Sequence, residues 1–270
     1  MKLNLKPVGC VSPETMLRNV ELCKARGLPE WKYADNRPPL AVVGGGNSAL
    51  EHIEELKTWK GDIWASGSVF HWLQDHGIEA TLFCVDPQPC LSGMAAGAKK
   101  ALLASNCDPS AFEVLRDAEV TVFDLVKDGV GINHGPTTGS ASFDLSVKMG
   151  YRDVSYFGFD SCYRNTERGD EKIMRVWHKT HAFKNEEDTT LMRVVCDGKA
   201  FITGAEFFMQ AEWMAGVFNA VPQIFKNRSD GLLAAMINDP DYDCTHMSAT
   251  MAAKLTPDGA EEVMFKAKAA

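Results

Sequence analysis

The chain has 270 residues and a mass of 29.7 kDa, which is enough for one large α/β domain with a buried core. Hydrophobic residues make up 45% and charged residues 24%, so the composition excludes a disordered or fibrous protein. The formal net charge of -8 disfavours nucleic acid as the main partner, because binding to a phosphate backbone needs a concentrated basic surface.

The cysteine pattern and the absence of signal-peptide and membrane-spanning patterns favour a cytoplasmic location. The eight cysteines include no CxxC pair, which favours reduced, mostly buried thiols over a disulfide framework. The first residues lack the apolar stretch and cleavage site of a signal peptide. No segment approaches the roughly 18 unbroken apolar residues that span a bilayer. We therefore expect a cytoplasmic protein without a transmembrane segment, and no pattern predicts its oligomeric state.

The first 38 residues predict a helix and a connector. Apolar residues recur at helical spacing over 13–26, Pro13 suits a first helical turn, and Gly27 is a stop signal. The polar, proline-rich stretch 31–39 then leads to the first apolar run. We expect three parts, which are this N-terminal piece (1–38), a catalytic domain (39–240) and a peripheral tail (241–270).

Strand and helix patterns alternate through the middle of the chain. Apolar strand candidates are LAVVGG at 40–45, DIWASG at 62–67, ATLFCVD at 80–86, EVTVFD at 119–124 and DVSYFGFD at 153–160. Helical patterns lie between them at 47–59, 68–76, about 93–104 and 138–149. This alternation predicts an α/β, Rossmann-like fold, with a mostly parallel sheet and helices on both faces.

The last hundred residues have a different pattern. Residues 165–190 are highly charged and weakly periodic, which suggests a long excursion or flap over the sheet edge. Residues 191–203 predict a β-hairpin with Asp197-Gly198 at the turn. An amphipathic helix is expected over 204–220 and another near 229–239, with Ser229 as its N-cap.

The sequence GGGNSALE places a glycine turn between the first strand and the next helix. Gly44, Gly45 and Gly46 carry no side chain, and free N–H groups at a helix start favour an anion. Ser48 and Glu51 have the spacing of a capping box. The stretch matches neither the G-x-G-x-x-G nor the P-loop pattern, so a turn used only for packing is the alternative. Its place at the carboxyl end of a strand favours binding.

Two aspartates end apolar strands in the same way. Asp86 follows ATLFCV, and Asp160 follows VSYFGF. A carboxylate at a strand end can hold Mg²⁺ or accept hydrogen bonds from a ribose, and an ordinary turn aspartate is the alternative. We expect both acids to face the glycine turn if their strands are neighbours.

Further candidates lie in two loops. Thr138, Gly139 and Ser140 open a helix, where small hydroxyl residues and N–H groups can bind phosphate or serve only as a cap. His178 and His181 lie three residues apart in the charged segment. Zinc binding is disfavoured there, since no cysteine is nearby and the HExxH pattern is absent. A phosphate-contacting or acid–base role for His178 competes with that of a solvated surface histidine.

The succession of these motifs resembles the MptE-like family, which includes 6-hydroxymethylpterin diphosphokinase and flagellin-associated glycosyltransferase-like proteins. The resemblance covers about residues 39–235. It lies in GGGNSALEHIEEL, ATLFCVDPQP, TTGSASFDLSVKMGYRDVSYFGFDSCY and GKAFITGAEFFMQAEWMAGVFNA with the later KNRSDGLL. Asn47 stands where the family commonly has proline, and Ala49 stands where it often has leucine.

The resemblance implies a nucleotide-using transferase. As a diphosphokinase it would move pyrophosphate from ATP to a small hydroxymethyl, pterin-like acceptor, with Mg²⁺ held by Asp86 or Asp160. The turn from Gly44 to Ser48, Asn47 included, would hold the phosphates. As a sialyltransferase-like or flagellin-modifying glycosyltransferase it would use a nucleotide-sugar in the same crevice. A non-catalytic ligand-binding protein is the third alternative. The diphosphokinase comes first because a single-domain chain suits a small soluble acceptor.

Overall fold

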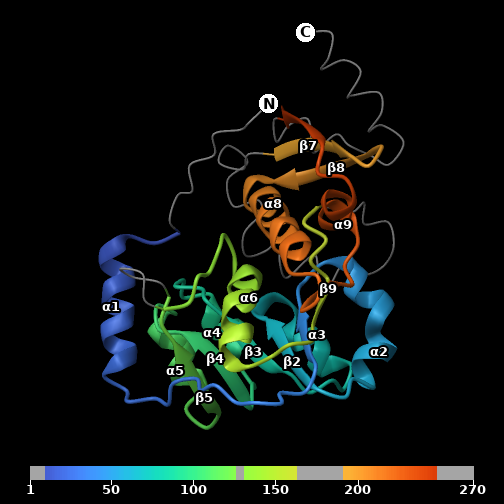
Figure 1. Cartoon of the computed structure of the whole chain (residues 1–270). Coiled ribbons are helices and arrows are strands. Elements are labelled where there is room, and N and C mark those ends of the chain that lie inside the picture. Colours follow the sequence, from blue (N-terminus) through green and yellow to red (C-terminus); the bar gives the residue numbers. More distant parts are fainter. Residues whose placement is uncertain (1–9, 126–130, 163–190, 248–270) are drawn as a thin grey trace.

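The computed structural model describes residues 10–125, 131–162 and 191–247. Within these residues, a seven-stranded sheet has the order β5-β4-β3-β2-β1-β6-β9, and each neighbouring pair is parallel (Figure 1). The strands are β1 (Leu40–Val43), β2 (Asp62–Ser66), β3 (Thr81–Cys84), β4 (Lys100–Ala104), β5 (Glu119–Phe123), β6 (Val154–Phe157) and β9 (Phe225–Asn227). The predicted α/β fold with a mostly parallel sheet is confirmed.

Helices cover both faces of the sheet. They are α1 (Pro13–Lys24), the 3-10 helix η1 (Asn47–His52), α2 (Ile53–Lys57), α3 (Gly67–Asp75), α4 (Leu91–Ala95), α5 (Pro109–Val114), α6 (Thr138–Met149), α8 (Ala205–Ala220) and α9 (Gly231–Asn238). Tyr156 stacks on Phe143 of α6, whereas Phe157 meets Trp59, just after α2, edge to face. Successive strand residues point to opposite faces, so α6 and α2 lie on opposite sides of the sheet.

A second, antiparallel sheet has the order β10-β7-β8. β7 (Leu191–Cys196) and β8 (Lys199–Gly204) form the predicted hairpin, with positive φ at both Asp197 and Gly198 as a type I′ turn requires. β10 (Tyr242–Met247) pairs with β7 and therefore extends the sheet into the predicted tail. Figure 1 shows this sheet with α8 and α9 above the seven-stranded sheet.

The strand order reverses next to β1. From β1 the chain adds β2, β3, β4 and β5 in one direction, and then returns to place β6 on the other side of β1. Open α/β sheets bind ligands outside the carboxyl ends of the strands where this reversal occurs. The carboxyl ends of β1 and β6 are therefore the place to look for a site, and we call this place the switch point.

Several sequence expectations need correction, among them the N-cap of α9, which is Asp230 rather than Ser229. The helix expected over 93–104 ends early at Ala95, and Lys100–Ala104 form β4 instead. The residues KALLA are good helix formers, but Gly97 has a φ of +78° and four of the five strand residues are buried between β3 and β5. The helix over 47–59 is the 3-10 helix η1 followed by the short α2. The short strand β9 was not predicted.

Buried aromatic side chains hold the sheet and its helices together. Phe143 of α6 contacts Tyr156, Phe218 and Phe225, with ring centroids 4.3 to 5.3 Å apart. All four residues of β1 are buried, as expected of a central parallel strand. No helix among the described residues is long and apolar enough to cross a membrane.

Two buried tyrosines predict a loss of stability at alkaline pH. Tyr151 donates to Asp62 Oδ2 at 2.5 Å, and Tyr156 shares a hydrogen bond with Ser142 Oγ at 2.8 Å. Burial raises the pKa of both tyrosine hydroxyls. The unfolded chain loses these protons near pH ~10, before the folded chain does, so the stabilisation present below that pH is lost as the pH rises. From about pH 8 to about pH 10.5, the free energy of unfolding should fall by about 0.8 kcal/mol per tyrosine. Urea titrations at both pH values measure the free energy of unfolding. If it falls as much in Tyr151→Phe as in the natural chain, the prediction is wrong.

Candidate functional site

The glycine turn leaves β1 at the switch point. Gly44 N–H donates to Phe157 O at 2.8 Å, and Gly46 N–H donates to Gly158 O at 2.7 Å. A Cβ added at Gly44 or Gly46 would lie 2.6 or 2.7 Å from Gly158 O, so no side chain fits at either position. The turn therefore packs its backbone directly on the backbone that leaves β6.

The packing is reciprocal at Gly158. This residue has a φ of +69°, and a Cβ there would lie 2.5 Å from Gly44 O and 2.9 Å from Ala49 Cβ. Glycine is thus required for its backbone conformation and for the close approach of the two loops. The loops after β1 and β6 behave as one interlocked unit.

Asp160 joins the two loops by side-chain hydrogen bonds. It is 2% exposed, and its carboxylate accepts from Ser48 N–H at 3.0 Å and from the Ser48 hydroxyl. The predicted capping box is wrong, since Gly46 is the N-cap of η1 and Ser48 bonds to Asp160 rather than Glu51. The carboxylate lies where the start of η1 favours an anion.

These contacts restrict which backbone donors of the glycine turn can meet a ligand. The N–H groups of Gly44, Gly46 and Ser48 already have protein acceptors. Gly45 and Asn47 N–H have no acceptor within the described part of the chain, and Asn47 Oδ1 is buried without a partner there. Two donors of the predicted phosphate loop therefore remain.

The start of α6 offers further donors at the carboxyl edge. Thr137 is the N-cap, and its N–H donates to Ser140 Oγ at 2.8 Å, which completes a capping box. Ser140 Oγ also donates to His134 O at 2.6 Å, so this predicted phosphate ligand is a buried cap. Thr138 and Gly139 N–H have no acceptor in the described ranges. They are donors at the positive end of a twelve-residue helix.

Two buried thiols lie beneath this helix start. Cys84 Sγ at the end of β3 is 4.0 Å from Thr138 Oγ1, and Cys107 Sγ donates to Cys84 O at 3.4 Å. Burial raises the pKa of the Cys107 thiol well above its usual range, so this group stays neutral. This contact places the start of α6 beside the carboxyl end of β3, and a Cβ at Gly139 would lie 2.1 Å from the Phe159 ring, so the same helix start also lies against the loop after β6.

Asp86 is partly exposed and lies apart from Asp160. Asp86 Oδ1 accepts from Gln88 N–H at 2.9 Å, two residues after β3. β2 and β1 separate β3 from β6, which is three strand spacings or about 14 Å. Mg²⁺–O bonds are about 2.1 Å long, so one ion would be held by one of these acids rather than by both. No cluster of three or more His, Cys, Asp or Glu that could hold a metal was found in the described ranges.

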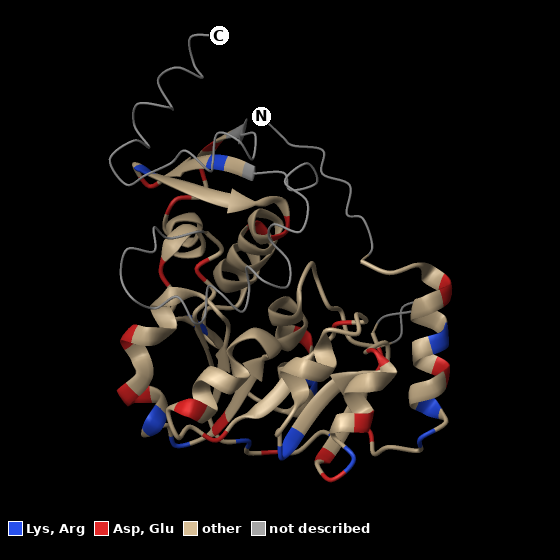
Figure 2. Ribbon diagram, turned by 180° about the vertical axis from the view of Figure 1, so that it is seen from behind, with Lys and Arg blue, Asp and Glu red and all other residues tan. Residues whose placement is uncertain are grey.

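Basic residues are scarce at the carboxyl edge. Lys60, Lys99 and Arg152 precede β2, β4 and β6 at the opposite edge, and most blue segments in Figure 2 lie on α1 and along the lower edge of the molecule. Among the described residues, Arg228 is the one basic residue within three positions after a strand of the large sheet. It is exposed and its guanidinium has no described partner.

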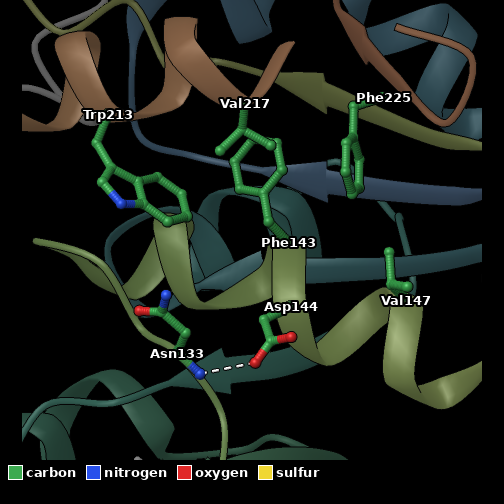
Figure 3. Close-up of a pocket in the computed structure, with 7 residues that line it drawn as sticks. All are labelled: Asn133, Phe143, Asp144, Val147, Trp213, Val217 and Phe225. Carbon is green, nitrogen blue, oxygen red and sulfur yellow. Dashed lines mark hydrogen bonds between the residues drawn. The ribbon is translucent and has the colours of Figure 1, made fainter. Parts of the chain in front are cut away.

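A pocket of about 250 Å³ lies away from the switch point, between α6 and α8 (Figure 3). Its polar rim is already engaged, because Asp144 Oδ2 accepts from Asn133 N–H at 2.7 Å and from Lys148 Nζ at 2.8 Å. The volume is below the roughly 300–1,000 Å³ of ligand pockets. It is therefore no part of the candidate site. Its lining residues are Asn133, Phe143, Asp144, Val147, Trp213, Val217 and Phe225.

Gln210 was missed by the sequence analysis. It is 5% exposed, and its side chain bonds to both Thr137 and Ser161 at the switch point. A signal existed, because Gln210, Met214 and Phe218 lie four apart on the buried stripe of α8. A polar residue on such a stripe needs buried partners.

His178, in contrast, lies outside the described residues, as do the predicted flap at 165–190 and most of the predicted tail.

The fold is similar to that of a MAf glycosyltransferase from Magnetospirillum magneticum AMB-1. The TM-score is 0.57 at 16% sequence identity, and the match covers 83% of this chain and 38% of that one. At this identity the likeness establishes the fold alone, and the chain spans well under half of its neighbour's length. No protein-family model matches the sequence, and no curated protein matches it. Membership of the MptE-like family stays a prediction.

Proposed function

We propose that the protein is a transferase that uses a nucleotide-sugar, with its phosphates bound at the switch point. The supporting observation is the start of α6, where Thr138 and Gly139 N–H have no described acceptor at the carboxyl edge of a parallel sheet. Gly45 and Asn47 N–H lie at the end of β1 in the same sheet. Backbone N–H groups at helix starts are suited to phosphate.

The proposed reaction moves a glycosyl group to an acceptor hydroxyl. The acceptor oxygen forms a bond to the anomeric carbon, and the bond from that carbon to the nucleotide phosphate breaks. The leaving phosphate keeps the electron pair, and the acceptor proton passes to a base. Arg228 would contact the leaving phosphate, since a charge-assisted hydrogen bond becomes stronger as negative charge develops there.

The two predicted acids take different roles in this proposal. Both oxygens of Asp160 already accept from Ser48, so Asp160 would hold the start of η1 in position. Asp86 is partly exposed and can act as the base, or can hold Mg²⁺ together with water and phosphate oxygens. A bound Mg²⁺ would neutralise charge on the phosphates.

The glycosyltransferase takes precedence over the diphosphokinase because the structural neighbour carries the name of a glycosyltransferase. Both activities would use the same phosphate-binding atoms and differ in the bond that breaks. A diphosphokinase would release AMP from ATP, whereas a glycosyltransferase would release a nucleoside diphosphate or monophosphate from the nucleotide-sugar.

Nucleotide binding is the first expected result. A thermal-shift and calorimetric screen would compare UDP-, GDP- and CMP-sugars with ATP, each with and without Mg²⁺. One nucleotide-sugar class should raise the melting temperature, because a ligand that binds only the folded state stabilises it. Arg228→Ala should weaken that binding about tenfold, the loss of one charge-assisted contact.

Arg116→Ala is the matched control, because Arg116 is exposed and its one ion pair among the described residues is with its neighbour Asp117. It should bind the nucleotide-sugar as the natural chain does. If ATP alone binds and a hydroxymethyl acceptor releases AMP from it, the diphosphokinase is correct. If no nucleotide binds, both transferase proposals are wrong.

A further inference from the structure

Gln210 of α8 makes two hydrogen bonds to two different loops at the carboxyl edge. Its Nε2 donates to Ser161 Oγ at 2.9 Å, and its Oε1 accepts from Thr137 Oγ1 at 2.7 Å. Both partners lie at the switch point, one directly after Asp160 and one directly before α6. A single buried amide thus bridges the loops that carry the candidate site.

The direction of each bond fixes the orientation of the amide. The Thr137 oxygen accepts from Ser140 N–H as the cap of α6, so its hydroxyl proton is free to donate to Gln210. Ser161 Oγ donates to Phe159 O at 3.2 Å and therefore accepts from the Gln210 nitrogen. A flipped amide would require both hydroxyls to turn, and the Ser161 hydroxyl would then lose its hydrogen bond to Phe159 O.

The loop contacted by Gln210 also has an unusual backbone. Ser161 is 6% exposed and has a φ of +55°, a conformation that side-chain-bearing residues rarely adopt. Thr203 Oγ1 of β8 donates to Ser161 O at 2.7 Å. The small sheet and α8 therefore hold the same residue from two sides, which stabilises a conformation that costs energy by itself.

We propose that Gln210 is a positioning residue that fixes the phosphate-binding start of α6 relative to the Asp160 loop. This inference rests on the proposed function for its ligand, and on the hydrogen bonds above for its geometry. Replacing the amide with an apolar side chain removes both bonds and leaves the Thr137 hydroxyl without its acceptor. The N-cap of α6 then loosens, and the Thr138 and Gly139 donors lose their fixed direction.

The experiment compares three variants of the full chain. Gln210→Met removes both hydrogen bonds at similar volume. Gln210→Glu keeps an acceptor for Thr137, and the Ser161 hydroxyl can turn to donate to the second oxygen. Gln74→Met is the matched control, because the Gln74 amide also makes two hydrogen bonds in a helix, at an exposed position outside this network. Each variant is measured by calorimetry with the nucleotide-sugar class that binds the natural chain, and by hydrogen exchange without ligand.

Gln210→Met should raise the Kd for the nucleotide-sugar about tenfold, because both buried hydrogen bonds are lost. Gln210→Glu should raise the Kd by less than about threefold, because buried hydrogen bonds are partly retained. Gln74→Met should leave the Kd unchanged. In the unliganded protein, amide exchange in the first turns of α6 and in β8 should be about tenfold faster in Gln210→Met only.

Two results would overturn the inference. One is a folded Gln210→Met variant whose Kd lies within about twofold of the natural value, below the effect of one lost hydrogen bond. The other is unchanged exchange in α6. If the natural chain binds no nucleotide, the proposed function fails by itself, and the exchange comparison still decides whether Gln210 positions α6.

Discussion

Replacing Asp160 by alanine should lower the free energy of unfolding by about 3–4 kcal/mol, because two buried donors lose their acceptor at about 1–3 kcal/mol each. The donors are the N–H and the hydroxyl of Ser48, and Asp160 is 2% exposed, so water does not replace the carboxylate without rearrangement. Urea titration followed by circular dichroism measures the change. Loss of this residue should also abolish nucleotide binding, since the η1 loop is no longer held against β6.

Asp108→Ala is a matched control for this prediction. Asp108 accepts from the N–H and the hydroxyl of Ser110 at 2.9 and 2.5 Å, the same pair of donors, but it is a partly exposed N-cap of α5. Its loss should cost about 1 kcal/mol, as for other N-caps. Similar losses for the two variants would mean that burial of Asp160 has no special effect, and would contradict the prediction.

Replacing Gly158 by alanine should destabilise the protein by about 4 kcal/mol, through left-handed backbone strain of about 1–2 kcal/mol and overpacking of about 1–3 kcal/mol. The new Cβ would lie 2.5 Å from Gly44 O and 2.9 Å from Ala49 Cβ, and backbone atoms cannot turn aside. Separation of the two loops is the only relief, so thermal unfolding should begin well below that of the natural chain.

Gly77→Ala isolates the strain from the clash. Gly77 has a φ of +72°, close to that of Gly158, but a Cβ there meets nothing within 4 Å. Its cost should be about 1–2 kcal/mol, the strain alone. If Gly158→Ala is no more destabilising than Gly77→Ala in the same thermal scan, the interlocked packing of the loops is not what requires glycine.

Local signals were sufficient where a segment's structure depends on its own residues. The helix expected over 138–149 is observed at Thr138–Met149, because a hydroxyl cap precedes it and Gly150, with a φ of +103°, ends it. The hairpin at 191–203 formed around Asp197-Gly198 for the same kind of reason. Capping and turn chemistry act over three or four residues, so a single sequence displays them.

Long-range pairing could not be predicted in the same way. Lys100–Ala104 became a strand because β3 and β5 flank them, which no local pattern shows. Asp86 and Asp160 were expected in one crevice if their strands were neighbours, but β2 and β1 lie between those strands. The alternation of helices and strands predicts a parallel sheet without fixing the order of its strands.

The position of part of the candidate site could be predicted from the sequence, whereas the roles of its residues stay predictions. The glycine turn, Asp160 and the start of α6 do gather at the carboxyl edge around β1 and β6. The bond between Ser48 and Asp160 joins residues 112 positions apart, and that between Thr137 and Gln210 joins residues 73 apart. These partners become evident only when the strand order and the placement of α8 are known.

The central place of β1 also shapes how the chain folds. β6, one of the two neighbours of β1, follows β1 about 110 residues later along the chain, which takes about 5–20 s at ribosomal speed. During that interval the apolar strand LAVV has one unpaired edge. A nascent chain in this state is open to pairing with other chains. Expression at reduced temperature or with a chaperone that shields exposed strands should therefore raise the yield of folded protein.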